Sequence, residues 1–102
     1  MISDKDKIER IMRMEQHLDV VKAAVCSLNA ALDQWEAAQP SYAALSEYYS
    51  SAQWRQDFAD DEAGRWPQGL RRGVLSEDGA WNALDAWREA KDRMHVLLGA
   101  EE

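Results

Sequence analysis

Two adjacent arginines, Arg71 and Arg72, are the side chains of this chain best suited to binding an anion. They lie in a turn between helical segments, where two guanidinium groups can bind a carboxylate or phosphate through paired hydrogen bonds. The same groups could instead pair with acidic residues of their own chain, such as Glu77 or the run from Asp57 to Glu62. The sequence leaves both roles open, an internal clamp and a contact to a partner.

Clustered carboxylates form a second candidate site, because divalent cations prefer oxygen ligands. The cluster consists of Asp57, Asp60, Asp61 and Glu62. With one of the two arginines it could serve a small metal-dependent hydrolase or transferase. However, the spacing lacks the EF-hand pattern, no Cys or His spacing is typical of a metal site, and the glycines form no nucleotide-binding motif. We therefore predict no metal, no cofactor and no enzymatic activity, and keep the hydrolase as an alternative.

The single cysteine, Cys26, is a poor candidate for a nucleophile, because a thiol needs a neighbouring base. His17 lies more than two helical turns from it, and His95 belongs to another predicted helix. We predict a structural cysteine. A chain with one cysteine also has no intramolecular disulfide, which favours a reducing cytoplasm over a secreted scaffold.

Composition predicts one all-α domain over residues 1–102. Apolar residues make up 46 % of the chain, but sixteen of them are Ala, which suits thin helix-on-helix packing. The net charge of −7 argues against binding to duplex nucleic acid, and it leaves open an acidic inhibitor that mimics nucleic acid. The N-terminus has no apolar signal segment and no run is long enough to span a membrane, so we expect a cytoplasmic protein.

A long first helix is predicted from Asp4 to Ala38. From residue 11 onward, every a and d heptad position is apolar, as in a coiled coil: Ile11, Met14, Leu18, Val21, Val25, Leu28, Leu32 and Trp35. Pro40 then kinks or breaks the helix, while the apolar phase continues to Tyr49.

The rest of the chain predicts a short helix over Ala52 to Ala59, a loop over Gly64 to Gly73, and a last helix that begins at Ser76 and stops at Gly99. The buried side of this last helix is assigned to Trp81, Leu84, Trp87, Met94, Leu97 and Leu98. The simplest architecture is a long antiparallel helical hairpin with a short helix and an irregular connection that contains Gly, Pro and Trp.

Four of the five tryptophans are predicted to lie in the core, namely Trp35, Trp54, Trp81 and Trp87. Trp66 is the exception, because it lies in the loop, where it either covers the end of the bundle or is exposed as a binding anchor. The predicted partner surface therefore consists of Tyr48, Trp66, Arg71 and Arg72.

A series of short motifs resembles a family of small bacterial proteins known as domain of unknown function 4298. The most specific is the run from Leu70 to Gly79, LRRGVLSEDG, followed by Trp81-Asn82. Upstream, in the same order, stand IERI at Ile8 to Ile11, Gln39-Pro40, Tyr48-Tyr49, Trp54 with Asp57, and Asp61-Glu62 before Gly64. Trp66 replaces an aliphatic residue of the family pattern, and Trp81 replaces a smaller aromatic one. The resemblance covers nearly the whole chain and implies an all-helical bacterial cytoplasmic protein, but no activity.

These observations favour a non-enzymatic, acidic interaction or regulatory protein. We expect a protein partner or a homodimer, no duplex nucleic acid and no membrane. Homodimerisation would use the first helix, because its apolar stripe is longer than the last helix can cover.

Overall fold

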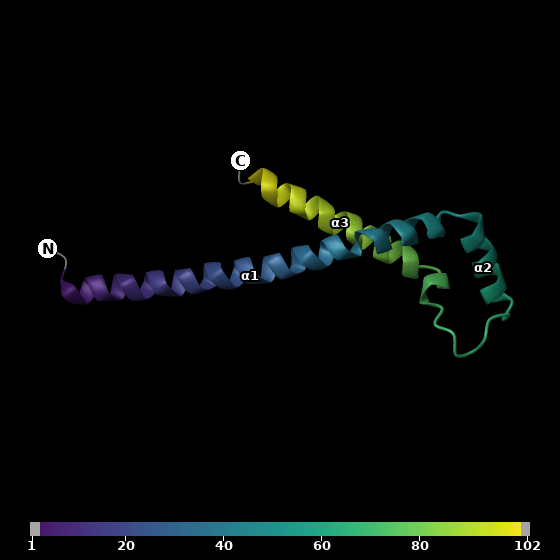
Figure 1. Ribbon diagram of the computed structural model, residues 1–102, viewed down its shortest axis with the longest axis horizontal. Helices are drawn as coiled ribbons and strands as arrows, with labels where there is room; N and C mark the ends of the chain where they lie inside the picture. Colours follow the sequence, from purple (N-terminus) through teal and green to yellow (C-terminus); the bar gives the residue numbers. More distant parts are fainter. Residues whose placement is uncertain (1–2, 101–102) are drawn as a thin grey trace. The chain divides into compact units, whose positions relative to one another are not determined.

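The computed structural model describes residues 3–100, and for Ala100 only the backbone. Its helices are α1 (Asp4–Tyr49), α2 (Ala52–Glu62), the short 3-10 helix η1 (Gly73–Leu75) and α3 (Gly79–Ala100) (Figure 1). No β-strand occurs within residues 3–100. The predicted all-α class is confirmed.

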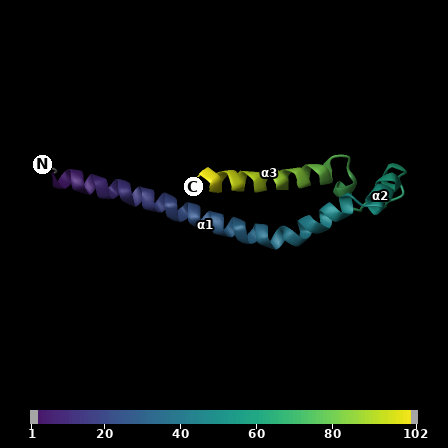
Figure 2. The same ribbon diagram turned by 90° about the horizontal axis from the view of Figure 1, so that it is seen from above.

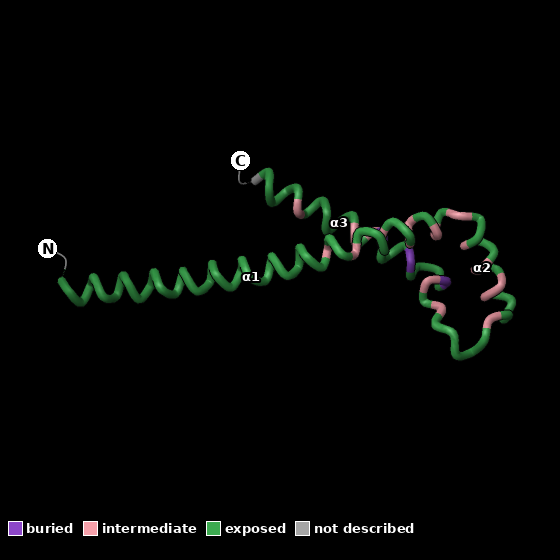
Figure 3. Tube along the Cα trace, in the orientation of Figure 1, coloured by how far each residue is buried: buried purple, intermediate pink, exposed green. Residues whose placement is uncertain are grey.

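The chain divides into two units, Met1–Gln39 and Pro40–Glu102, and α1 contributes to both. The described part of the first unit is helical from Asp4 onward, and its residues 3–34 are all exposed (Figure 3). The second unit contains the last turns of α1, together with α2, η1, α3 and the irregular residues between them. It holds the three buried apolar residues of the described chain, Leu75, Ala80 and Leu84.

The helix α1 continues through Pro40 without interruption, so the alternative of a break at this residue is wrong. Proline removes one backbone donor and crowds the preceding turn, which costs a helix roughly 3 kcal/mol. The residues that follow explain why the helix persists. Tyr42, Leu45 and Tyr49 are half-buried and keep the apolar phase, so packing after the proline favours the helical conformation.

A pair of serines, Ser50 and Ser51, ends α1 and begins α2. The Ser50 hydroxyl donates to the carbonyl oxygen of Ser46 at 2.7 Å, which satisfies one of the last carbonyls of α1. Ser51 is the N-cap of α2, since its Oγ accepts a hydrogen bond from the backbone N–H of Trp54. The short helix extends three residues further than predicted, to Glu62.

The end of α2 is a Schellman motif closed by Gly64. The N–H of Arg65 donates to the carbonyl of Asp60, and the N–H of Gly64 donates to that of Asp61, each at 3.0 Å. Gly64 has φ of +71°, in the left-handed region that favours glycine. This turn sends the chain out of α2 into the loop.

The predicted helical hairpin is confirmed, with a short helix and an irregular connection between its arms. Within the second unit, the end of α1 and the helix α3 run in opposite directions (Figures 1 and 2). They meet through aromatic rings, because Tyr42 and Trp87 stack with centroids 4.8 Å apart and planes 13° apart. The connection carries residue 75 of the core at the base of this hairpin, and Ala80 and Leu84 follow on α3.

The last helix begins later than the sequence predicted, and it covers only part of the predicted face: Leu84, Trp87 and Met94 are covered as expected. Ser76 still acts as a cap, because its Oγ accepts from the N–H of Gly79, but α3 itself starts at Gly79 and runs past Gly99 to Ala100. On this face Ala80 and Leu84 are buried, and Trp87 and Met94 are half-buried. The prediction that Trp81, Leu97 and Leu98 are buried was wrong: each is at least half exposed. Trp81 lies one residue, about 100° of helix rotation, from Ala80, so it points away from the core when Ala80 points in.

Gly79 is a required glycine for a steric reason. A Cβ atom at this position would overlap the carbonyl oxygen of Gly73 and the hydroxyl of Ser76. The carbonyl belongs to η1, so the obstacle is backbone and cannot rotate away. This close approach explains why a glycine occupies the third residue after the cap, where a capping box would have Glu or Gln.

We expect Gly79→Ala to lower the free energy of unfolding by about 1–3 kcal/mol, the typical cost of overpacking. Gly99→Ala is the matched control in the same helix, since a Cβ there meets nothing within 4 Å. That control should be neutral or more stable by up to about 1 kcal/mol, because Ala is the better helix former. Urea denaturation followed by circular dichroism measures both. Equal stability of the Gly79→Ala variant and the wild type would contradict the steric explanation.

Candidate functional site

Asp57 is the residue on which the polar contacts of the connection converge. Its Oδ2 accepts a hydrogen bond from the hydroxyl of Tyr48 at 2.5 Å, and its Oδ1 accepts one from Nε2 of Gln53 at 2.9 Å. Tyr48 is the penultimate residue of α1, whereas Asp57 lies in the middle of α2. The pair therefore fixes α2 against the end of α1.

Burial and the neighbouring carboxylate both act on Tyr48. Desolvation of the phenolate, followed by the hydrogen bond to Asp57 and the charge of Asp57, raises the pKa of Tyr48 from 10.0 to about 12. The hydroxyl therefore stays protonated at neutral pH and acts as a donor. Such a group holds a structure together and does not serve as a general base.

Trp54 joins α2 to η1. Its indole Nε1 donates to the backbone carbonyl of Val74 at 3.0 Å. Its ring stacks on Phe58, with centroids 5.1 Å apart, and meets the edge of Tyr49 at 4.8 Å. Trp54 was predicted to lie in the core; it is half-buried, with its ring packed on Tyr49 of α1 and Phe58 of α2 and its polar nitrogen satisfied.

Trp66 makes the corresponding contact from the loop. Its indole Nε1 donates to the backbone carbonyl of Asp57 at 3.1 Å, and the side chain is half-buried. Through this contact Trp66 holds the loop against α2. One part of the ring still borders an open pocket.

The two predicted arginines have different positions. Arg72 pairs with Asp61 at an N–O distance of 2.5 Å, so it clamps the connection to the end of α2. Arg65 makes a similar pair with Asp60 at 2.9 Å. Arg71 is exposed and forms no ion pair with any residue in the described range 3–100.

An open pocket of about 220 Å³ lies between α1, α2 and the connection. It is lined by Tyr48, Asp57, Trp66, Leu70, Arg71, Val74 and Leu75. Most of this lining is aliphatic or aromatic. Three polar residues of the lining, Tyr48, Asp57 and Trp66, already form hydrogen bonds within the chain. Arg71 is therefore the charged group of the pocket that has no partner among residues 3–100.

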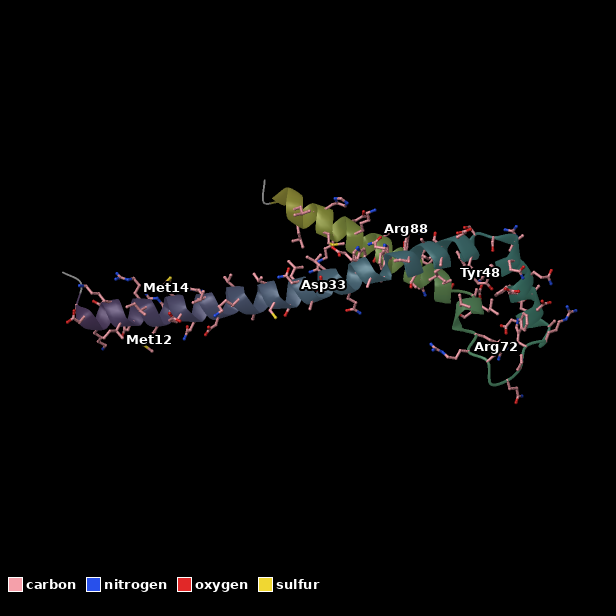
Figure 4. The ribbon with its side chains drawn as sticks, in the orientation of Figure 1. Met12, Met14, Asp33, Tyr48, Arg72 and Arg88 are labelled. Carbon is pink, nitrogen blue, oxygen red and sulfur yellow. The ribbon has the colours of Figure 1, made fainter. Side chains whose placement is uncertain are left out.

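Three of the four residues of the predicted partner surface meet in this pocket: Tyr48, Trp66 and Arg71. The fourth, Arg72, faces Asp61 instead (Figure 4 labels Tyr48 and Arg72). Sequence reasoning missed the apolar wall made by Leu70, Val74 and Leu75, because loop positions show no periodicity from which burial can be inferred.

The acidic run does not form a common metal site. Asp60 and Asp61 each pair with an arginine, and Asp57 accepts from Tyr48 and Gln53. Within the described part of the chain, no three His, Cys, Asp or Glu side chains are grouped so that they could hold a metal ion. Cys26 is an exposed free thiol. None of the helices within residues 3–100 combines the length and the apolarity that a membrane span requires.

The raised pKa of Tyr48 predicts a distinct alkaline titration. Tyrosinate absorbance should show a component near pH 12 that disappears in Tyr48→Phe and persists in Tyr42→Phe. Asp57→Asn should lower the pKa of Tyr48 only in part, because desolvation is the larger cause. Since the folded state favours the protonated phenol, its stabilisation should be complete below pH 10 and lost as pH rises from about 10 to 12. A Tyr48→Phe variant with an unchanged titration curve would refute this assignment.

The ion pair predicts that the two adjacent arginines differ in their effect on stability. Arg72→Ala should lower the free energy of unfolding by up to about 1 kcal/mol, a modest amount because the two side chains are 35 % and 23 % exposed. Arg71→Ala should change it by less than about 0.5 kcal/mol. Tryptophan fluorescence in urea measures the free energy of unfolding of each variant. A double-mutant cycle of Arg72→Ala with Asp61→Ala measures the coupling energy of the Arg72–Asp61 pair. An Arg71→Ala variant as unstable as Arg72→Ala would contradict the different roles.

Comparison with known proteins places the chain in a family. The family model described as Domain of unknown function (DUF4298) matches residues 11–96, which include both the pocket and most of the long helix. Neither a curated protein nor a solved structure matches the chain. The matched residues span well over half of the sequence, and the protein belongs to the DUF4298 family.

Proposed function

We propose that this protein is a non-enzymatic interaction module that binds a segment of a partner protein in the pocket beside Arg71. The segment inserts an apolar side chain between Trp66 and Leu70 and directs a carboxylate to the guanidinium of Arg71. The observation that carries this proposal is the combination of an open, largely apolar pocket with one arginine that has no acidic partner among residues 3–100. We further propose that it acts in the cytoplasm, as the single cysteine favours.

The chemistry of the lining supports a protein ligand. Trp, Tyr and Arg are enriched at the positions that contribute most to protein interfaces, and all three types border this pocket. A volume of about 220 Å³ suits one large side chain and is smaller than the typical site of a cofactor. An unpaired guanidinium in a chain of net charge −7 selects an acidic group close to it, because the rest of the protein repels one.

The surroundings of the pocket support binding over catalysis. A catalytic site needs a titratable group that is free to exchange a proton with substrate. The Tyr48 hydroxyl donates to Asp57, and a pKa of about 12 keeps it protonated. The nearby carboxylates of Asp60 and Asp61 are paired with arginines.

Selection from a random peptide display library tests the proposal while the natural partner is still unidentified. With the wild-type protein as bait, the enriched peptides should place a large apolar residue next to Asp, Glu or a free C-terminal carboxylate. Arg71→Ala should weaken their binding about tenfold, which is the loss of one partly exposed ionic contact of about 1.4 kcal/mol. Fluorescence anisotropy with a selected peptide measures the dissociation constant.

Arg55→Ala is the matched control, because Arg55 is an exposed arginine on α2 outside the pocket lining. It should leave the affinity unchanged, and raised salt should weaken wild-type binding more than Arg71→Ala binding. Selected peptides that bind the Arg71→Ala variant as tightly as the wild type would overturn the proposed site. Comparative purification from cells, with both variants, then identifies the natural partner.

A further inference from the structure

An uninterrupted apolar stripe follows the first unit of α1. Its members are Ile11, Met14, Leu18, Val21, Val25, Leu28 and Leu32, and each is between 37 % and 59 % exposed. They occupy consecutive a and d heptad positions of one continuous helix, over about 33 Å at a rise of roughly 1.5 Å per residue. Met14, which belongs to the stripe, and Met12, which does not, point to opposite sides of α1 (Figure 4).

We infer that this stripe is the interface of a parallel, in-register two-stranded coiled coil with a second copy of the chain. The inference is independent of the pocket. Its first support is the regularity of the pattern, because apolar a and d positions sustained over three heptads are typical of helix pairing. A helix face that stays in contact with solvent is ordinarily polar, so an unbroken apolar stripe indicates a face that is covered by another helix.

The flanking charges favour a second copy in parallel orientation. In a parallel pair, each g position faces the e position of the next heptad on the other helix. Arg10 occupies a g position and Glu15 the following e position, so the dimer contains two symmetric Arg10–Glu15 attractions. The next g position is His17, which faces Lys22 and adds no attraction, and Ala24 and Ala31 at the later g positions carry no charge.

The antiparallel registers are less favourable. The register that pairs the whole stripe, with Leu18 opposite Leu28, also sets Lys22 against Lys22 of the second copy. A shift of one heptad relieves this repulsion and pairs Glu15 with Lys22. However, it places both copies of Leu32 opposite Lys7, and their burial is lost. Of these three arrangements, only the parallel one pairs the whole stripe and also places an opposite-charge pair, Arg10 with Glu15, beside it.

Sedimentation equilibrium of the full chain tests for the dimer. At tens of micromolar the mass should be twice the chain mass of 11.6 kDa. Val21→Glu should raise the dimer dissociation constant by more than about 100-fold, because it buries two like charges in one apolar layer. Val20→Glu makes the same chemical change at the neighbouring position, which is 67 % exposed and lies off the stripe, and should leave the dissociation constant nearly unchanged.

The orientation is tested by spin labels on Lys5→Cys in a Cys26→Ser background. In the parallel dimer the two labels should lie about 20–25 Å apart, as an interaxial distance of 8–10 Å plus the label arms requires. In either antiparallel register they would be separated by more than about 40 Å of helix. Circular dichroism of each variant confirms that the helices remain formed.

Three results would overturn the inference. A monomer at tens of micromolar would show that no second copy binds, including the case in which Val96, Leu97 and Leu98 of α3 cover the stripe instead. A dimer unaffected by Val21→Glu would place the interface elsewhere. A dimer with only the long label distance would exclude the parallel register. In each of these cases Arg71→Ala should still weaken peptide binding. The dimer proposal and the pocket proposal can therefore be refuted separately.

Discussion

The hydrogen bonds that converge on Asp57 are the constraint on which the second unit depends. This unit has very little buried apolar surface: three small or medium side chains are buried, and the aromatic residues are only partly covered. A core of this size cannot order an irregular connection by burial alone. Asp57 compensates by accepting from Tyr48 through its carboxylate and from Trp66 through its backbone carbonyl. One residue therefore connects α1, α2 and the loop.

Hydrogen bonds within the chain also explain why the pocket is largely apolar. Trp66, the indole that lines the pocket, donates its nitrogen to the backbone carbonyl of Asp57, so its ring contributes apolar surface to the pocket. Arg72 is engaged by Asp61, whereas Arg71, one residue earlier, is left without an acidic neighbour in the described chain. The residues that hold the connection, Tyr48, Trp54, Asp57, Asp61, Arg72 and Gly79, all lie within the range that the DUF4298 family model matches.

The two units place two kinds of surface on one chain. The first unit offers a linear apolar seam of the kind that pairs helices, and the second offers a small pocket with a single charge. The two surfaces bind different ligands: the apolar stripe pairs with another helix that has the same heptad pattern, and the pocket accommodates one side chain. A dimer formed through the seam would carry two pockets, and a partner with two binding segments would gain avidity from it.

Periodic features of this protein were predictable from sequence, and local contacts were not. The heptads located α1, the two serines located the start of α2, and the net composition excluded strands, because these signals act between neighbours on one helix. The apolar residues of α3 correctly indicated Leu84 but also suggested Trp81 and Leu97, whereas packing buried Ala80 in place of these two, since small residues let η1 approach closely. Sequence likewise could not separate Arg71 from Arg72 or decide the role of Trp66. Only the tertiary structure made those choices, because they depend on which backbone carbonyl or carboxylate the irregular connection brings within hydrogen-bonding distance.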